Sequence, residues 1–357
     1  MTNLINEMEW GKPILPRVKD PEWEAEVNAE LGMVPDLMTR VSRSHWLRKA
    51  CLNWERLPVK EMPVRLRDIA ALVTAQENAC RYCYGVARSQ MRLFEYSEKM
   101  IGNIEREMQL AELDEKDHSF IQFCRNLARS NPRPAKADRD KLIRLGFSEL
   151  AVSEMAFLIT NHCFYNRVAT FISCPPMHKL EKLAGSVLGR ILRPLFARKI
   201  RGLALTKVDP LSGELESFPG VVKALSGLPA AALLNEALNG VFSSNVLSQE
   251  LKILMFAVVA RSLECDFCQV ETRNMSLAQG LTESEFDSCL SSLTSPRLNE
   301  QESKILAWTR ETVQFQTGPI QKRIRELAKE IDEEVLLEAI GVAALANTTV
   351  RLAMLLE

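Results

Sequence analysis

Apolar residues recur along the chain at the three- and four-residue spacing of an amphipathic helix. Segments 65–79 (RLRDIAALVTAQENA) and 250–263 (ELKILMFAVVARSL) carry this pattern over several turns. Further segments open with Ser, Thr or Asp followed by an acidic residue, as the first turn of a helix does: 96–105, 147–160, 281–290 and 331–347. Alternating β-branched runs are few and hairpin signals are absent. The pattern predicts an all-α fold.

The helical pattern occurs twice along the chain. A shift of 185 residues superimposes Cys80, Cys83, Arg88 and Glu98 on Cys265, Cys268, Arg273 and Glu283. After one deletion, a shift of 184 superimposes Glu154 and Arg167 on Glu338 and Arg351. A register held this long indicates one domain of roughly 140 residues present twice, with the copies related by an approximate twofold axis. We therefore divide the chain into an N-terminal arm (1–32), a first repeat (33–174), a basic helix and linker (175–218) and a second repeat (219–357).

The segment between the repeats begins with a basic amphipathic stretch, residues 178–201. Its apolar stripe consists of Leu180, Leu183, Val187, Ile191 and Leu195, and Lys and Arg occupy the other faces. Such a helix can lie on an anionic membrane surface. Because Glu181 and Pro194 interrupt this one and no lipidation signal accompanies it, we favour an interdomain or oligomer contact over membrane contact.

Composition narrows the class of protein. The chain has 357 residues, of which 46% are apolar, which is enough to fill two ordinary cores. Its formal net charge of -1 gives no overall attraction for a polyanion, so we expect no nucleic-acid partner. The chain has nine cysteines, an odd number spread over a long sequence, which is typical of a protein whose thiols are reduced. The N-terminus lacks the pattern of a signal peptide. We therefore expect a cytoplasmic protein.

Each repeat contains two cysteines separated by two residues, Cys80 and Cys83 in the first and Cys265 and Cys268 in the second. Each pair follows an apolar helix and a short break, so we expect it at the start of the next helix. Backbone N–H groups and the positive end of the helix dipole favour a thiolate there. At this spacing one sulfur can attack an oxidant and the other can close a disulfide. Two other interpretations stay open: a zinc site of four thiolates, and core thiols without chemistry.

The order of these residues resembles the alkylhydroperoxidase D and carboxymuconolactone decarboxylase superfamily. In each repeat an acidic residue ends one helix, C-x-x-C begins the next, and an Arg follows near the end of the domain. The family's closing N-x-x-N-R-x-A pattern is present in part, as Asn166-Arg167-Val168-Ala169 and as Asn347, Arg351 and Ala353. The resemblance covers both repeats. It implies an all-helical fold that assembles as oligomers of single domains, so that a fused pair resembles a built-in dimer.

The chain departs from the family at its proton relay. The family places a His four residues after the second Cys, where this chain has Ala87 and Thr272. It places a Glu twelve residues before the first Cys, where this chain has Asp68 and Ile253. Positioned acid–base groups contribute about 10²–10⁴ in rate, so a family-type activity is expected to be weak or organised differently. His162, near the closing motif, is a lesser candidate for the missing base.

The resemblance implies a hydroperoxide reductase that needs no cofactor. Cys83, and Cys268 in the second repeat, would attack the peroxide as thiolates, and Cys80 and Cys265 would resolve the sulfenic acids to disulfides. Asp68 would assist proton movement in the first repeat only. An external dithiol, such as a thioredoxin-like or lipoyl protein, would restore the thiols, and the protein would form a homo-oligomer. The alternatives are a non-catalytic oligomeric binding or assembly protein and a dithiol–disulfide exchange protein.

The charged neighbours of the two pairs differ. Arg81 lies between the two cysteines of the first pair, and its positive charge favours a thiolate. Asp266 lies between the two cysteines of the second pair and Glu264 lies directly before them, and these negative charges disfavour a thiolate. We therefore expect the first pair to be the more reactive.

The repeated arginines are expected to be structural. Arg88 and Arg273 stand at a poor helical offset for contact with a thiol, so we expect them in salt bridges. Arg167 and Arg351 are expected to tie helices together through acids such as Glu154 and Glu338.

Overall fold

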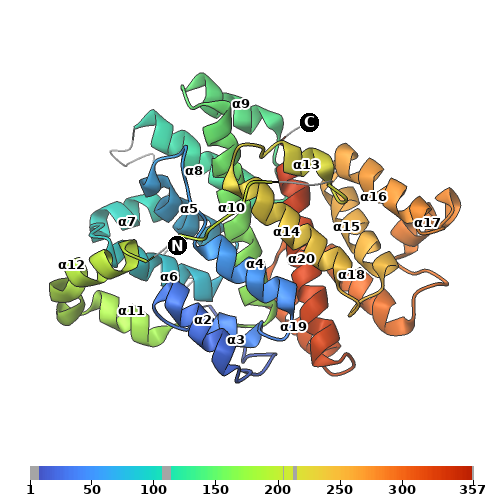
Figure 1. The fold of residues 1–357 in the computed structure, drawn as a ribbon, viewed down its shortest axis with the longest axis horizontal. Helices are drawn as coiled ribbons and strands as arrows, with labels where there is room; N and C mark the ends of the chain where they lie inside the picture. Colours follow the sequence, from blue (N-terminus) through green and yellow to red (C-terminus); the bar gives the residue numbers. More distant parts are fainter. Residues whose placement is uncertain (1–7, 107–113, 204, 212–214, 356–357) are drawn as a thin grey trace.

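The computed structural model describes residues 8–106, 114–203, 205–211 and 215–355 (Figure 1). Within these ranges all regular secondary structure is helical, which confirms the all-α prediction. The first part of the chain forms α2 (Pro21–Leu31), α3 (Asp36–Arg40), α4 (His45–Glu55), α5 (Val64–Glu77), α6 (Arg81–Leu93), α7 (Glu98–Glu105), α8 (Glu115–Ala128), α9 (Lys136–Arg144), α10 (Glu149–Phe171), α11 (His178–Gly185) and α12 (Val187–Arg201). The second part forms α13 (Pro219–Lys223), α14 (Pro229–Ser243), α15 (Gln249–Leu263), α16 (Asp266–Ala278), α17 (Glu283–Ser292), α18 (Glu300–Gln314), α19 (Thr317–Leu327) and α20 (Glu333–Ala353).

The polar residues at the predicted helix starts act as N-caps. The side chains of Ser97, Ser148 and Thr282 each accept a hydrogen bond from a backbone N–H in the first turn of the helix that follows. Asp332 does the same for α20. These caps satisfy donors that would otherwise lack an intrahelical partner, which is why the helices begin where the sequence indicates.

Helix positions recur with the same spacing as the sequence matches. Helices α5, α6, α7 and α8 begin at residues 64, 81, 98 and 115, and α15, α16, α17 and α18 begin at 249, 266, 283 and 300, each 185 residues later. Helix α20 begins 184 residues after α10.

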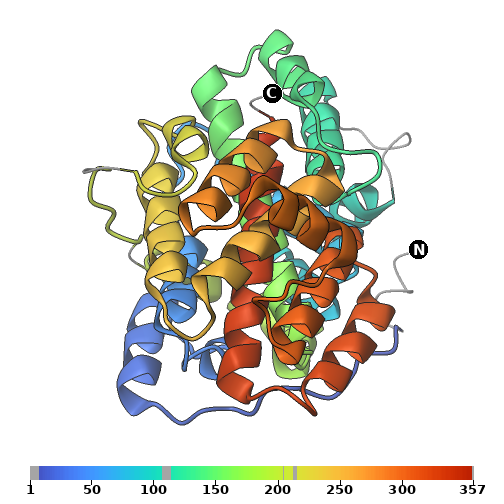
Figure 2. The same ribbon diagram turned by 90° about the vertical axis from the view of Figure 1, so that its right-hand side faces the viewer.

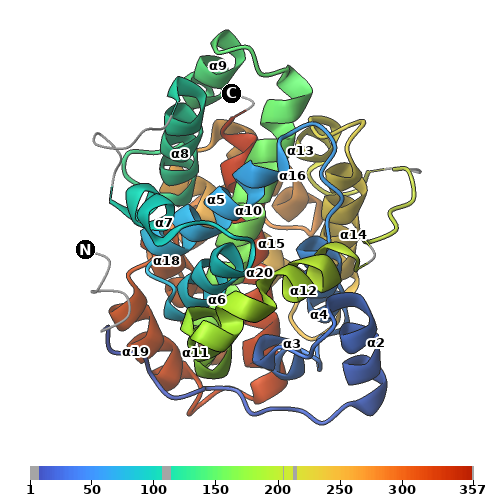
Figure 3. The same ribbon diagram turned by 90° about the vertical axis from the view of Figure 1, so that its left-hand side faces the viewer.

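The long helices α10 and α20 lie along each other in the middle of the molecule, and the shorter helices surround them (Figures 1 and 3). Figure 2 shows helices of the second half, in orange, covering one side of α20. Apolar side chains from both halves form a single core cluster rather than two separate cores. Helix α20 alone among the described helices has the length and composition of a membrane span, and it is almost entirely buried in this core.

The basic stretch 178–201 is two helices, not the one continuous helix predicted. Ser186 ends α11 and also caps α12, where its hydroxyl accepts a hydrogen bond from the N–H of Gly189 at 2.9 Å. A side chain at Gly189 would collide with the carbonyl oxygen of Leu183, so the turn needs a glycine there. Pro194, expected to interrupt the stretch, lies inside α12. The predicted apolar stripe is therefore divided between two helices that point in different directions.

Candidate functional site

The first cysteine pair lies at the start of α6, as predicted. Helix α5 ends at Glu77, and Ala79 turns the chain with a φ of 45° before Cys80 caps the next helix. The sulfur of Cys80 is fully buried and accepts a hydrogen bond from the backbone N–H of Cys83 at 3.3 Å. Cys83 itself is only half-buried. The two sulfurs therefore occupy different environments although they stand three residues apart.

The pKa values of the two thiols are shifted in opposite directions. Burial opposes ionisation of Cys80, but hydrogen bonds from the thiol and backbone of Cys83 and from the Thr170 hydroxyl outweigh it and lower the pKa of Cys80. Burial, followed by the hydrogen bond to Cys80 and the charge on Cys80, raises the pKa of Cys83, and the side chain of Asn166 opposes this rise. The first negative charge of the pair is therefore held on Cys80, and Cys83 keeps its proton.

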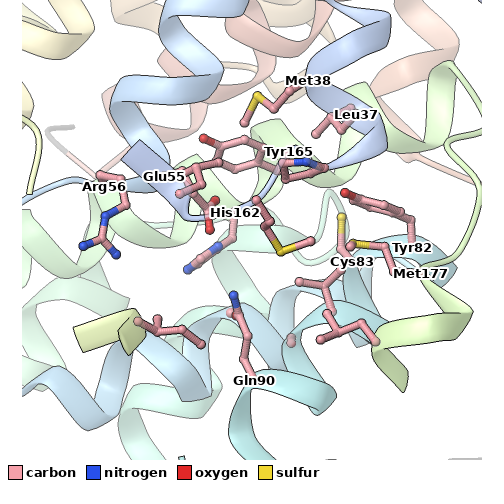
Figure 4. Close-up of a pocket in the computed structure, with 18 of the residues that line it drawn as sticks. Leu37, Met38, Glu55, Arg56, Tyr82, Cys83, Gln90, His162, Tyr165 and Met177 are labelled. Carbon is pink, nitrogen blue, oxygen red and sulfur yellow. The ribbon is translucent and has the colours of Figure 1, made fainter. Parts of the chain in front are cut away.

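Cys83 lines a cavity of about 190 Å³ (Figure 4). Most of the wall is apolar, with contributions from Leu37, Met38, Val86, Met177 and Leu180. Helices far apart in the sequence meet here, because the wall contains residues from α3, α6, α10, α11 and α12. An apolar cavity of about 150 Å³ is large enough for benzene, so this one can hold a small organic molecule.

Two titratable side chains, His162 from α10 and Glu55 from the end of α4, reach the same cavity (Figure 4). Burial, assisted by the charge of Arg67, lowers the pKa of His162 to about 3, so its imidazole is neutral near pH 7. Its Nε2 atom is buried and has no hydrogen-bond partner among the described residues. Burial raises the pKa of Glu55, while Arg67 and Arg56 oppose the rise. An unsatisfied buried nitrogen facing a cavity marks a place where a ligand or water is expected to bind.

The structure does not bring the predicted relay residue Asp68 to the cavity. Asp68 accepts a hydrogen bond from the hydroxyl of Tyr96 at 3.0 Å and is absent from the cavity wall. Ala87, at the position of the family's His, does line the cavity. His162 approaches from a different helix, and it lies one helical turn before Asn166, the residue that contacts Cys83.

The positive charge of Arg81 is neutralised by an ion pair. Its two terminal nitrogens donate to both carboxylate oxygens of Glu181 on α11, each at 2.8 Å. Cys80 owes its lowered pKa to hydrogen bonds with its neighbours, and Arg81 is not among the causes. The prediction that Arg81 favours the thiolate of the first pair is therefore wrong; the acids beside the second pair were a separate reason.

The second pair also begins a helix but lies away from the cavity. Cys265 is the N-cap of α16, and both Cys265 and Cys268 are fully buried. Neither lines the cavity at Cys83. Thr272, at the second position of the family's His, donates its hydroxyl to the carbonyl of Cys268 at 2.7 Å, so it supports the helix backbone instead. The acid beside this pair, Glu264, forms an ion pair with Arg133 at 2.6 Å.

The two repeated arginines that follow the pairs form ion pairs, as predicted. Arg88 contacts Glu98 at 3.1 Å and Glu105 at 3.0 Å. Arg273 contacts Asp287 at 2.7 Å and also Glu283.

The prediction for Arg167 and Arg351 is wrong, because neither pairs with the repeated glutamates. Arg351 donates to the carbonyls of Leu127 and Val313, at 3.2 and 3.3 Å. Arg167 lies over the ring of Phe315, 4.8 Å from its centroid. Glu154 instead accepts from three consecutive backbone N–H groups, those of residues 60–62, and Glu338 accepts from Ser44 and Trp46. The carboxylate of Glu154 thereby satisfies loop N–H groups, and that of Glu338 satisfies side-chain donors at the start of α4.

No group of three or more His, Cys, Asp or Glu side chains in the described part of the chain could hold a metal ion. The four thiolates that the zinc interpretation requires are therefore not brought together there.

No model of a known protein family matches the chain, and no curated protein matches it.

Proposed function

We propose that the protein is a thiol peroxidase whose first cysteine pair reduces a small organic hydroperoxide. The observation that carries this proposal is the placement of the pair: Cys83 faces an apolar cavity, and Cys80 sits behind it with its anion stabilised. The resemblance to the alkylhydroperoxidase D superfamily supports the same chemistry. A thioredoxin-like or lipoyl dithiol in the cytoplasm would restore the pair, and no bound cofactor is needed.

In the proposed reaction Cys83 transfers its proton to Cys80 within their hydrogen bond and attacks the terminal peroxide oxygen. A sulfur–oxygen bond forms, the oxygen–oxygen bond breaks, and the leaving alkoxide takes up a proton to become an alcohol. Cys80 then gives up the proton that it took from Cys83 and attacks the sulfenic sulfur as a thiolate; the leaving hydroxide takes up that proton to become water, and the disulfide forms. One thiol, one thiolate, one hydroperoxide and one further proton become one disulfide, one alcohol and one water, so two electrons and two protons pass to the peroxide.

His162 and Glu55 would position the peroxide and supply a proton in this cavity. With its pKa lowered to about 3, His162 stays neutral, so its imidazole is suited to hydrogen-bond the peroxide rather than to accept a proton. Glu55, whose pKa is raised by burial, is suited to donate a proton to the leaving oxygen. Together they would perform the task of the missing family relay, in place of Asp68, Ala87 and their counterparts in the second repeat.

We also propose that the chain is a tandem duplication whose two repeats are related by an approximate twofold axis. The constant shift between helix starts supports this, as does the pairing of equivalent helices, α10 with α20 and α4 with α14. In this arrangement one chain resembles a fused dimer in which Cys83 of the first repeat lines a cavity. The burial of Cys265 and Cys268 supports a structural role for the second pair.

The proposal is tested by counting thiols before and after reaction with four equivalents of cumene hydroperoxide, which is enough to oxidise both cysteine pairs. We expect fast loss of two thiols and a Cys80–Cys83 disulfide by peptide mapping. Cys83→Ser should abolish the fast loss, whereas the matched variant Cys268→Ser should retain it. His162→Phe, which removes the hydrogen-bonding nitrogen, should slow it by about 10-fold.

Each other outcome points to a different function. Loss of four thiols would mean that both pairs are active and would contradict the assignment to one repeat. No fast loss would contradict the peroxidase proposal and leave the non-catalytic binding protein. If a disulfide-bonded protein substrate oxidises the pair while the hydroperoxide does not, dithiol–disulfide exchange is the function.

A further inference from the structure

Helix α12 exposes an apolar face to solvent. Val187, Ile191 and Leu195 stand four residues apart and are 69%, 69% and 65% exposed, and Leu188 beside them is 58% exposed. Of the eight large apolar side chains that are exposed in the described part of the chain, four lie on this one helix. Clusters of this kind are typical of interaction sites rather than of ordinary surface.

The same segment is strongly basic although the chain is nearly neutral. Residues 178–203 contain seven Lys and Arg residues and one acidic residue, Glu181, which is already paired with Arg81. Helical spacing places Arg190 and Lys199 on opposite sides of the apolar stripe and Arg198 at its C-terminal end. These three side chains are exposed.

The exposed face belongs to an anchored helix. Helices α11 and α12 pack on α6 at the periphery of the molecule (Figure 3). Ala184 of α11 and Ala197 of α12 are buried on the inner side. The opposite side of α12 therefore faces outward in a fixed orientation, and nothing in the described part of the chain covers it.

We propose that α12 docks the protein on an anionic lipid surface. The apolar stripe would lie at the boundary between head groups and acyl chains, and Arg190, Arg198 and Lys199 would bind the phosphate head groups. A second copy of this chain is a poorer occupant, because pairing two such faces would bring their cations together. The sequence alone favours an oligomer or interdomain contact here; the exposure of the stripe argues against the interdomain contact. This inference does not depend on the peroxidase activity.

Docking would also place the cavity beside the lipid. Leu180 of α11, Ile200 of α12 and Leu203 just beyond α12 line the cavity at Cys83. The helix whose outer face would contact the lipid therefore also contributes to the wall of the cavity.

The test is co-sedimentation of the full chain with vesicles of phosphatidylcholine alone or mixed with phosphatidylglycerol. We expect binding to the mixed vesicles only, and weaker binding as salt is raised. Ile191→Ser and Leu195→Ser should each lower the partition coefficient by roughly tenfold, because each removes a large apolar side chain from the interface. Arg190→Gln and Arg198→Gln should each lower it by roughly fivefold.

A matched pair of variants provides the control. Val187→Ser alters the proposed face, and Val270→Ser alters a similarly exposed valine on α16. Only the first should weaken vesicle binding, and neither should change the circular dichroism spectrum. Failure to bind mixed vesicles at low salt would overturn the proposal. So would a fall in oligomeric mass caused by the α12 variants in the absence of lipid, which would identify the face as a contact between copies.

Discussion

At the scale of single residues, the two sulfurs of one C-x-x-C pair have different tasks. Cys80 caps α6, and its buried sulfur collects hydrogen bonds that stabilise an anion. Cys83 lies in the first turn, where its side chain meets the cavity. The cap position therefore decides which sulfur carries the charge, and the cavity decides which sulfur meets a substrate.

This division predicts the effect of Cys80→Ser on the reactivity of Cys83. The hydrogen bond to Cys80 and the charge on Cys80 both help to raise the pKa of Cys83, so removing that thiolate should lower it. Serine keeps an acceptor at the cap and so preserves the helix start. We expect the pH profile of Cys83 alkylation by iodoacetamide to move to lower pH, as measured by mass spectrometry of its peptide. The equivalent cap variant Cys265→Ser should leave the profile unchanged, and a shift to higher pH would contradict the account.

At the scale of elements, α11 closes the cavity and one ion pair holds it to α6. Arg81 and Glu181 join the two helices through parallel hydrogen bonds at a partly buried site. Gly85 permits this contact, because a Cβ atom there would lie 2.0 Å from the carboxylate of Glu181. The apolar contact of Leu180 with the cavity depends on the same docking.

Breaking this ion pair is predicted to open the cavity. Glu181→Gln removes the charge, and Gly85→Ala displaces the carboxylate, so both should loosen α11 at a cost of about 1–3 kcal/mol. Hydrogen–deuterium exchange should become faster in residues 178–185, and Cys83 should be alkylated several-fold faster. Gly102→Ala in α7 is the control, since its new methyl would meet only Arg106 at 3.9 Å. Unchanged exchange in α11 would show that other contacts hold the helix.

At the scale of the whole molecule, the two halves are joined through buried polar contacts as well as through α10 and α20. Arg351, from the last helix, donates hydrogen bonds to carbonyls and a hydroxyl in the segment 127–130 of the first half. Thr317 donates to the carbonyl of Asn78, just before the first cysteine pair. The second half thus supports the loop from which the site begins.

Arg351→Met is predicted to destabilise the whole chain. Methionine fills similar space but leaves several buried carbonyls without donors, so the free energy of unfolding should fall by about 3–5 kcal/mol. Urea unfolding followed by circular dichroism measures this change, and both halves should unfold in one transition. The control is Arg273→Met, which removes an arginine with exposed ion-pair partners and should cost about 1 kcal/mol or less. Equal losses for the two variants would contradict the proposed role of Arg351.

Much of the local structure could be predicted from the sequence. Apolar spacing and capping residues depend on neighbours three or four positions away, so the helix starts at Ser97, Ser148 and Thr282 were correctly predicted, as was the position of both cysteine pairs. The ion pairs of Arg88 and Arg273 were predicted because helical spacing turns both side chains away from the thiols, and their partners lie in the helix that follows.

The cavity and its polar residues could not be predicted in this way. Glu55 and Cys83 come from helices whose contact depends on the packing of α4, α6 and α10, and no periodic signal marks Glu55. The family resemblance pointed to Asp68 as the relay residue, whereas packing brought His162 of α10 to the cavity.

The sequence by itself determined that this protein is helical, where most helices begin, and that two cysteine pairs stand at helix starts, because these features arise from interactions within a few residues. Only the tertiary structure decided that one pair reaches a cavity while the other is buried, that Arg81 is neutralised by Glu181, and that the apolar stripe of α12 faces solvent. Burial and charge pairing depend on residues distant in the chain, and those are brought together only when the helices pack.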